Sequence, residues 1–357
     1  MVMDYLNWRG DLTFFQDGFG EVDALALCTA TYVELDQIVP DNFTETVTFY
    51  EAAHKLEQHL EDSKYNKIGL IIPEDVIDLF LNMARCPRYK NLRLCGYINH
   101  IDEKAEKQFA AVTFQNDNGE IYIVYRGTDD TIVGWREDFN MAFLDVLPAQ
   151  KEACVYYRKV LQSMKGRVRL MGHSKGGNLA VYSAVHGGKN GQKRLLKVYS
   201  MDGPGFHEDF LELEAYRNIA EKVLWYMPYE SIIGTVLMHG CNEFIVKSSA
   251  KGIMQHNPLS WMICQNMFVK EKHLSKEAVL AHLAITECLE QLTVEQRKQF
   301  VGIIFDALDA TEAKKLADIR LKNIFGLIDS VKKLDPDSKN LFKETARLVL
   351  KTVKENR

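Results

Sequence analysis

Residues 169–180 of this chain read Arg-Leu-Met-Gly-His-Ser-Lys-Gly-Gly-Asn-Leu-Ala, and this stretch decides the fold that we expect. An apolar run ending at Met171 leads directly into Gly172-x-Ser174-x-Gly176, and a run of small residues follows. A strand, a sharp turn and a helix in this order form a nucleophile elbow, in which a Cβ two residues before or after the serine would collide with the turn. The stretch therefore predicts that Ser174 Oγ projects above the N-terminus of a helix beginning near Lys175.

The same glycines would also suit an ordinary turn between a strand and a helix that pack closely together. Two features favour the elbow over that alternative. One is the apolar strand before the serine, and the other is the helical run after it, which contains Gly177, Ala180 and Ala184. We therefore interpret Ser174 as a nucleophile.

The composition is that of a globular protein with enough apolar residues for a full core. Of the 357 residues, 46% are hydrophobic and 26% are charged, and the net charge is -5. This acidic balance argues against nucleic acid as the principal partner. The N-terminal residues do not form a signal peptide, and no apolar run is long enough to span a membrane. Seven cysteines without a C-x-x-C pair are typical of a reduced, cytoplasmic protein.

Strands and helices alternate around the elbow, which predicts an α/β fold with a mostly parallel sheet and helices on both of its faces. Residues 4–11 are interpreted as an entry loop or edge element. Helical spacing predicts helices over 21–35 and 45–61, after Pro73, and over 150–164. Alternating patterns predict strands over 92–101, 109–114, 121–125, 168–171, 197–201, 222–226 and 243–247, with a hairpin turn at Asp117-Asn118-Gly119.

The chain becomes purely helical from about Ser275. Thr293-x-x-Gln296 is a capping box that predicts the start of one helix, and two more are expected from Thr311 and from Asp335-Pro336. We therefore predict an α/β-hydrolase domain over 1–270 and a helical extension over 271–357 packed on it. We recognise no chemistry in the extension.

A serine nucleophile needs a base, and on an α/β-hydrolase the chain order is serine, then acid, then histidine. His256 follows the last predicted strand in a loop, where the base of this fold belongs. His173 lies within the elbow, and we expect its side chain to point away from the reacting side of the serine. His256 is therefore the predicted base, with a histidine that only fixes the turn before Pro258 as the alternative.

Two carboxylates compete to orient the predicted base. Asp202 follows the first strand after the elbow and is held by the stiff turn Gly203-Pro204-Gly205. Glu230 follows the next strand, which is the usual position of the acid in this fold. We favour Asp202, because a short and rigidly mounted carboxylate orients an imidazole better, and we keep Glu230 as the alternative acid. Either residue would also serve simply to stabilise its turn.

The oxyanion hole needs backbone donors from the elbow and from the loop after an earlier strand. Lys175 supplies the first N–H, and Thr128 in Arg126-Gly127-Thr128 is predicted to supply its N–H and its hydroxyl. Gly127 allows the backbone to approach closely. Arg126 is expected to pair with a nearby carboxylate such as Asp138.

These motifs resemble those of class 3, triacylglycerol-type lipases. The segment Tyr125-Arg126-Gly127-Thr128 with Trp135, Asp138 and Phe139 is similar to their R-G-[ST] … W-x-x-D segment, and residues 172–177 resemble their G-H-S-L-G-G elbow. The resemblance implies that Ser174 is the nucleophile and that Thr128 serves the oxyanion hole. Residues 199–206 are also similar to the acid-bearing segment of pancreatic-type lipases, which implies Asp202.

The likeness covers about residues 108–260 and has two departures. Lys175 stands where the lipases usually have an apolar residue, and the aspartate that follows a later strand in class 3 lipases is absent, with Glu230 nearby. The whole chain also resembles members of an uncharacterised bacterial lipase-like family. That family implies a fold and leaves the substrate open.

The sequence thus predicts a serine esterase or lipase-like hydrolase that cleaves a carboxylic ester, lipid-like or short-chain, through an acyl-enzyme. Substrate binding is assigned to Trp135, in a segment 129–146 that is expected to act as a lid, and to Trp261 and Met262. A buried core role for that second apolar stripe is the alternative. No metal, nucleotide or redox-cofactor motif is present. A hydrolase-fold scaffold that binds without turnover is the competing function, and the oligomeric state stays open.

Overall fold

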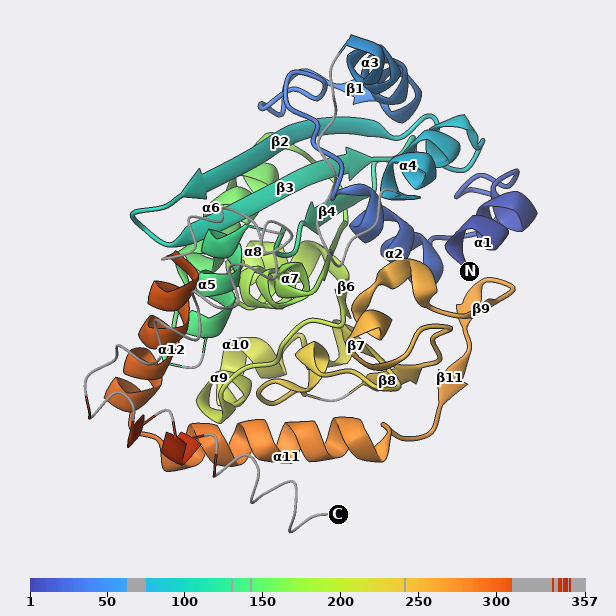
Figure 1. Cartoon of the computed structure of the whole chain (residues 1–357). Helices are drawn as coiled ribbons and strands as arrows, with labels where there is room; N and C mark the ends of the chain where they lie inside the picture. The colour runs from blue at the N-terminus through green and yellow to red at the C-terminus, as the bar shows by residue number, and fades with distance from the viewer. Residues whose placement is uncertain are drawn as a thin grey trace.

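The computed structural model describes residues 1–62, 75–129, 131–141, 143–240 and 242–309, together with Pro336, Asn340, Leu341, 343–345 and Arg347. A sheet of nine strands in the order β1-β2-β3-β4-β5-β6-β7-β8-β11 forms its centre (Figure 1). The strands are β1 (Val47–Thr48), β2 (Arg93–Asp102), β3 (Lys107–Gln115), β4 (Ile121–Tyr125), β5 (Val168–His173), β6 (Leu195–Met201), β7 (Val223–Pro228), β8 (Glu243–Val246) and β11 (Lys270–Glu271). A separate two-stranded sheet pairs β9 (Ile263–Cys264) with β10 (Met267–Phe268).

Strands β4 to β8 are parallel to one another, whereas β1 to β4 are antiparallel and β11 pairs antiparallel with β8. The predicted α/β-hydrolase fold is therefore confirmed, and the parallel half of its sheet contains the elbow. The hairpin turn at 117–119 joins β3 to β4 as predicted, with Gly119 at a φ of 82°. Because parallel strands end at one edge, the loops after β5, β6 and β8 can meet there.

The helices are α1 (Val2–Arg9), α2 (Glu21–Ala30), α3 (Phe49–Asp62), α4 (Asp75–Arg85), α5 (Ile132–Asn140), α6 (Pro148–Ser163), α7 (Lys175–Val185), α8 (Gly188–Arg194), α9 (Glu208–Glu212), α10 (Glu214–Arg217), α11 (Lys276–Gln291) and α12 (Val294–Asp309). Four short 3₁₀ helices complete the described elements: η1 (Ala220–Lys222), η2 (Ile233–Thr235), η3 (Gly252–His256) and η4 (Pro258–Ser260). None of the helices in the described part of the chain is long and apolar enough to cross a bilayer.

The central strands are buried on both faces, and two apolar cores result. In β4, Tyr122 and Val124 face the core beneath α1 to α4, whereas Ile121, Ile123 and Tyr125 face the core beneath α6 and α7. This alternation follows from the period of two along a strand. Helices thus cover both faces, as the alternation of strands and helices predicted.

The interpretation of residues 4–11 as an entry loop or edge element is wrong, because residues 2–9 form α1. Val2, Tyr5 and Leu6 lie three and four positions apart, so they share one helical face, and all three are buried. Tyr5 also donates a hydrogen bond to the buried Asp23 at 3.0 Å. Docking against α2 therefore stabilises α1, a helix that the local sequence alone does not predict.

The C-terminal helices α11 and α12 lie beyond the last sheet strands, and α12 reaches back to α5 (Figure 1). The predicted capping box at the start of α12 is confirmed, because Thr293 Oγ1 accepts from Gln296 N at 3.2 Å and Gln296 Oε1 accepts from Thr293 N at 2.9 Å. The helices expected from Thr311 and Asp335 fall outside the described residues except for a few positions of the second.

Candidate active site

Ser174 occupies the sharp turn between β5 and α7. Its backbone has φ 56° and ψ -134°, a conformation that few residues other than glycine adopt. A Cβ at Gly172 would lie 2.1 Å from the Gly176 backbone, and a Cβ at Gly176 would lie 2.1 Å from the Tyr125 carbonyl oxygen. Both positions therefore require glycine, and the local geometry is that of a nucleophile elbow.

Asp202 has similar strain at the end of the neighbouring strand β6, where its φ is 50°. Among the non-glycine residues with positive φ in the described ranges, only Ser174 and Asp202 are buried. The two turns are joined directly, because Ser174 N donates to the Met201 carbonyl at 2.9 Å. Strain of about 1–3 kcal/mol at each position persists only where the surrounding structure holds it, and it is characteristic of functional sites.

The Asp202 carboxylate meets the predicted base. Its Oδ2 lies 2.6 Å from His256 Nδ1, and its Oδ1 accepts from Ser231 Oγ at 2.5 Å and from Gly234 N at 3.1 Å. Both carboxylate oxygens of Asp202 therefore have hydrogen-bond partners, which fix the carboxylate next to the imidazole. The Nδ1 proton is directed to Asp202, which leaves Nε2 as the acceptor of the ring.

His173 holds the loop that carries His256. Its Nε2 lies 2.8 Å from the His256 carbonyl oxygen and its Nδ1 lies 2.8 Å from Tyr32 Oη. Burial lowers the pKa of His173 well below its usual value, so the ring is neutral. The His173 ring also packs beside the His256 ring, with the two ring centroids 4.5 Å apart. Among the described residues no hydrogen bond joins Ser174 Oγ to His256 Nε2, a contact that often tightens only when substrate binds.

Glu230, the alternative acid, lies in a different network. Its Oε2 accepts hydrogen bonds from Gly252 N and, at 2.8 Å, from Gln255 Nε2. Gln255 Oε1 in turn accepts from Glu230 N at 3.0 Å. Glu230 therefore stabilises the loop before His256 through hydrogen bonds. The carboxylate that contacts the imidazole is that of Asp202.

Lys175 and Thr128, the two expected oxyanion donors, both have a backbone N–H that is free of an acceptor among the described residues. Lys175 is the first residue of α7, so its N–H has no acceptor within the helix. The Thr128 N–H likewise has no acceptor in the described ranges, and its chain passes so close to the elbow that a Cβ at Gly127 would lie 2.4 Å from the His173 carbonyl. The expectation for the Thr128 hydroxyl is wrong, because Oγ1 donates to Asp138 Oδ2.

Arg126 pairs with a nearby carboxylate, as expected, but that carboxylate is Asp129 and not the suggested Asp138. Its Nη2 donates to Asn99 Oδ1 at 2.7 Å and lies 3.5 Å from Asp129 Oδ2. Asp138 instead contacts Lys175 Nζ and the Thr128 hydroxyl.

The Lys175 side chain forms a buried charge network that the sequence did not predict. Its Nζ lies 2.8 Å from Glu137 Oε2, 2.9 Å from Gln108 Oε1 and 3.6 Å from Asp138 Oδ1. Burial acts to lower the pKa of Lys175, but the Glu137 and Asp138 carboxylates outweigh it and raise that pKa, so the ammonium stays charged. The only sequence signal was the presence of a lysine among small and apolar residues.

Glu137 ties α5 to the sheet from inside this network. Its Oε1 accepts from Ala149 N at 2.9 Å, and its Oε2 accepts from Gln108 N at 3.0 Å as well as from Lys175. The side chains of Glu137 and Lys175 are completely buried. The residue after Ser174 therefore anchors α5, within the segment 129–146 that we expected to cover the site.

We expect Lys175→Met to lower the free energy of unfolding by about 3–5 kcal/mol, because it leaves the Glu137 carboxylate buried and unpaired. The double variant Lys175→Met with Glu137→Gln should regain much of that loss. Arg85→Met is the matched control, because the Arg85–Glu57 pair is exposed and should contribute less than about 1 kcal/mol. Urea unfolding measures all of these, and equal losses for Lys175 and Arg85 would contradict the account.

The Asp138 carboxyl is poised to titrate near neutral pH. Burial raises its pKa from 3.8 to about 6, although Lys175 and the Thr128 hydroxyl act to lower it. The folded protein therefore binds this proton more tightly than the unfolded chain does. As a result, Asp138 contributes stability at low pH that is lost as the pH rises through about 6.

Asp138→Asn should remove this pH dependence. Relative to the variant, the wild type should lose about 1.4 kcal/mol of unfolding free energy between pH 5 and pH 8. The measurement is urea unfolding of both proteins at intervals across that range. A difference between the two proteins that does not change with pH would contradict the assigned titration.

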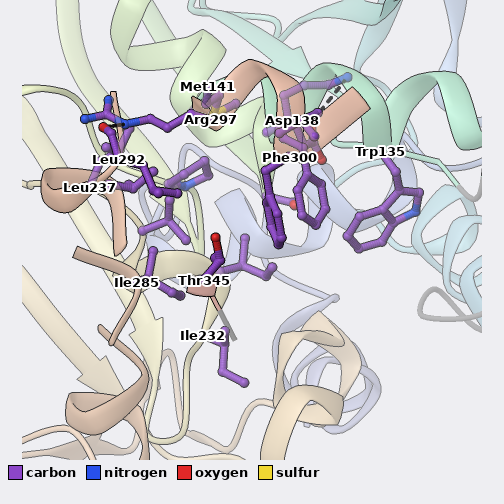
Figure 2. A pocket seen from close by; sticks show the side chains of 18 residues that line it. Trp135, Asp138, Met141, Ile232, Leu237, Ile285, Leu292, Arg297, Phe300 and Thr345 are labelled. Atoms are coloured by element: carbon purple, nitrogen blue, oxygen red, sulfur yellow. Dashed lines mark hydrogen bonds and ion pairs between the residues drawn. The ribbon is translucent and has the colours of Figure 1, made fainter. Parts of the chain in front are cut away.

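A cavity of about 360 Å³ opens beside Ser174 and is lined mostly by apolar side chains (Figure 2). Its walls come from α5, from residues 232–237, and from α11 and α12. Trp135 lines it, as expected, together with Phe139 and Met141 of the same segment. The helical extension thus contributes to the site, although the sequence showed no chemistry in it.

The assignment of Trp261 and Met262 to substrate binding is wrong, because neither lines this cavity. Trp261 is completely buried, donates its indole N–H to the Gln255 carbonyl at 2.9 Å and packs against Phe268. Met262 N donates to the Lys247 carbonyl at 2.8 Å. The apolar stripe after His256 is therefore core and loop structure, which was the alternative reading.

Across the described ranges, no group of three or more His, Cys, Asp or Glu side chains is arranged to hold a metal ion. The polar groups near Ser174 are instead those of the Asp202–His256 pair and the Lys175 network.

Comparison with known proteins gives a family and several structural neighbours. The fungal lipase–inhibitor complex used to model interfacial activation is 13% identical, covers 63% of this chain and 76% of its own, and has a TM-score of 0.36. The Rhizomucor miehei lipase–propeptide complex is 16% identical, with 55% and 67% covered and a TM-score of 0.34. M37 lipase is 14% identical, with 61% and 70% covered and a TM-score of 0.38.

A comparison with curated proteins found no match. The model of the Mbeg1-like family matches residues 83–306, which include the elbow, the loop of His256 and most of α12. Because this match extends over more than half of the chain, the protein belongs to the Mbeg1-like family.

Proposed function

We propose that this protein is a serine hydrolase that cleaves a carboxylic ester through an acyl-enzyme, with Ser174 as the nucleophile. The observation that carries the proposal is the 2.6 Å contact between Asp202 Oδ2 and His256 Nδ1, next to a serine in strained elbow geometry. A carboxylate that fixes the imidazole tautomer leaves Nε2 free to accept the serine proton. A merely structural turn would not need this combination of strain, burial and oriented imidazole.

In the proposed reaction, Ser174 Oγ attacks the ester carbonyl carbon while its proton moves to His256 Nε2. The N–H groups of Thr128 and Lys175 then stabilise the tetrahedral oxyanion, and Asp202 stabilises the imidazolium. Collapse of the intermediate breaks the bond to the leaving alcohol, whose oxygen takes the proton from His256. Water next attacks the acyl-enzyme with His256 again as the base, which releases the carboxylic acid and restores Ser174.

The apolar cavity beside Ser174 supports a lipid-like or other acyl ester as the substrate. Apolar walls with a few polar groups at one end are typical of sites that bury an acyl chain and orient the bond to be cleaved. The anchoring of α5 through Glu137 and Lys175 keeps Trp135 and Asp138 at the wall of this cavity. We infer that these residues position substrate and take no part in proton transfer.

The test is hydrolysis of p-nitrophenyl esters by the purified full chain, followed at 405 nm. We expect turnover that saturates with ester concentration and is lost on treatment with an organophosphorus reagent. The hydrolase proposal is wrong if the folded protein hydrolyses none of the esters and the reagent modifies no serine. That outcome would favour a hydrolase fold that binds a ligand without turnover.

A further inference from the structure

We propose that α11 and α12 form the far wall of the acyl site, and that they select esters of a single acyl chain of medium length. This inference rests on the proposed hydrolase function of Ser174. It concerns helices outside residues 108–260, the stretch whose motifs resemble the lipases.

Ser174 and the C-terminal helices line the same cavity. Ile285 and Leu289 line it from α11, and Phe300 and Val301 line it from α12. In Figure 2 the side chains of Phe300 and Ile285 gather around this space. An acyl chain bound to Ser174 Oγ that extends into the cavity would therefore contact both helices.

The wall is held in place at both ends. In α11, His282 Nδ1 lies 2.7 Å from the carbonyl oxygen of Thr235, which belongs to the 232–237 segment that also lines the cavity. In α12, Phe305 packs edge-on against Phe139 with ring centroids 5.5 Å apart, and the Arg136 guanidinium lies 5.2 Å from the same ring. These contacts hold α11 against the 232–237 segment and α12 against α5, so both helices are fixed at the wall of the cavity.

The size and lining of the cavity indicate which ester fits. At about 30 Å³ for each liquid-packed non-hydrogen atom, a volume of 360 Å³ holds roughly a dozen such atoms. One chain of about eight to ten carbons with its carboxyl group meets that limit, whereas the second and third chains of a triacylglycerol do not fit beside it. The substrate class is therefore a monoacyl ester.

The experiment measures kcat/KM for p-nitrophenyl esters from acetate to palmitate with four variants of the full chain. Leu289→Trp fills the cavity from α11, and Phe300→Ala enlarges it from α12. Leu283→Trp is the matched control for the first, because Leu283 is on α11, is 38% exposed and does not line the cavity. Val294→Ala, at an exposed position of α12, is the control for the second. Thermal unfolding checks that each variant is folded.

We expect wild-type kcat/KM to rise by up to about fourfold for each added methylene, equal to about 0.8 kcal/mol, and to fall beyond about ten carbons. Leu289→Trp should lower the ratio of decanoate to acetate activity at least about tenfold, and Phe300→Ala should move the optimum to longer chains. Both control variants should keep the wild-type profile. A common profile for all five proteins would overturn the inference while leaving the hydrolase proposal intact.

A binding measurement tests the wall independently of catalysis. Decanoate binding to Ser174→Ala protein, measured by calorimetry, should weaken at least about tenfold when Leu289→Trp is added and should not change with Leu283→Trp. If all esters resist hydrolysis but this difference is found, the proposed function fails and the acyl site stands. If decanoate binds equally to both double variants, or does not bind, the acyl site itself is wrong.

Discussion

Alanine in place of Ser174 is expected to lower kcat for ester hydrolysis on the order of 10⁵-fold, because no other group would form the acyl-enzyme. The residual rate would come from the oxyanion donors and from substrate binding. The measurement is a single-turnover and steady-state comparison of the two proteins with the same p-nitrophenyl ester.

The fold should survive this change. Alanine must adopt the same strained backbone at position 174, and the serine hydroxyl donates no hydrogen bond to another described residue. We therefore expect a melting temperature within about 3 °C of the wild type. Ser174→Gly makes a second inactive protein, which should be the more stable of the two because glycine adopts this conformation without strain. Retention of more than about a tenth of the wild-type activity by both would contradict the role of Ser174.

Asp202→Asn is expected to lower kcat about 10⁴-fold while changing the fold little. The remaining oxygen of asparagine can still accept from Ser231 and Gly234, but its amide group would face His256 Nδ1. That contact favours the tautomer in which Nδ1 accepts and Nε2 carries the proton. The base then cannot take the Ser174 proton, so turnover falls although every residue stays near its place.

Glu230→Gln is the matched control, because it changes the other candidate acid in the same way. Glutamine can still accept a hydrogen bond from the loop at Gly252 and Gln255, and it has no contact with the imidazole. We expect kcat within about threefold of the wild type. A large loss with Glu230→Gln and a small one with Asp202→Asn would reverse the assignment.

Much of the parallel half of the sheet could be predicted from sequence, because its constraints are local. The elbow needs glycine at 172 and 176, and the alternating strands with turn residues between them fix the order of the loops. That order also brought Asp202 and His256 to one edge, since parallel strands end together there. Which of Asp202 and Glu230 reaches the imidazole could not be settled, because both follow adjacent strands and only tertiary packing turns one of them inward.

The features that sequence missed depend on contacts between distant segments. The partner of Lys175 is Glu137, 38 residues away, and no periodicity indicates that both side chains point into the same buried space. The far wall of the cavity requires α12 to dock against α5 and α11 to dock against η2, which their own helical patterns do not specify. Likewise the stripe at Trp261 is equally apolar whether it lines a cavity or fills a core, so only the three-dimensional structure separates the two.

The most direct test of the account is mass spectrometry of the full chain after reaction with a fluorophosphonate probe. A serine activated by an oriented imidazole displaces fluoride and forms a stable phosphonate ester. We predict one adduct on the intact protein, located on the peptide that contains Ser174, and no adduct on the Ser174→Ala protein or on protein denatured before treatment. Native protein that remains unlabelled, or that is labelled equally when Ser174 is alanine, would contradict the claim that this serine is the nucleophile.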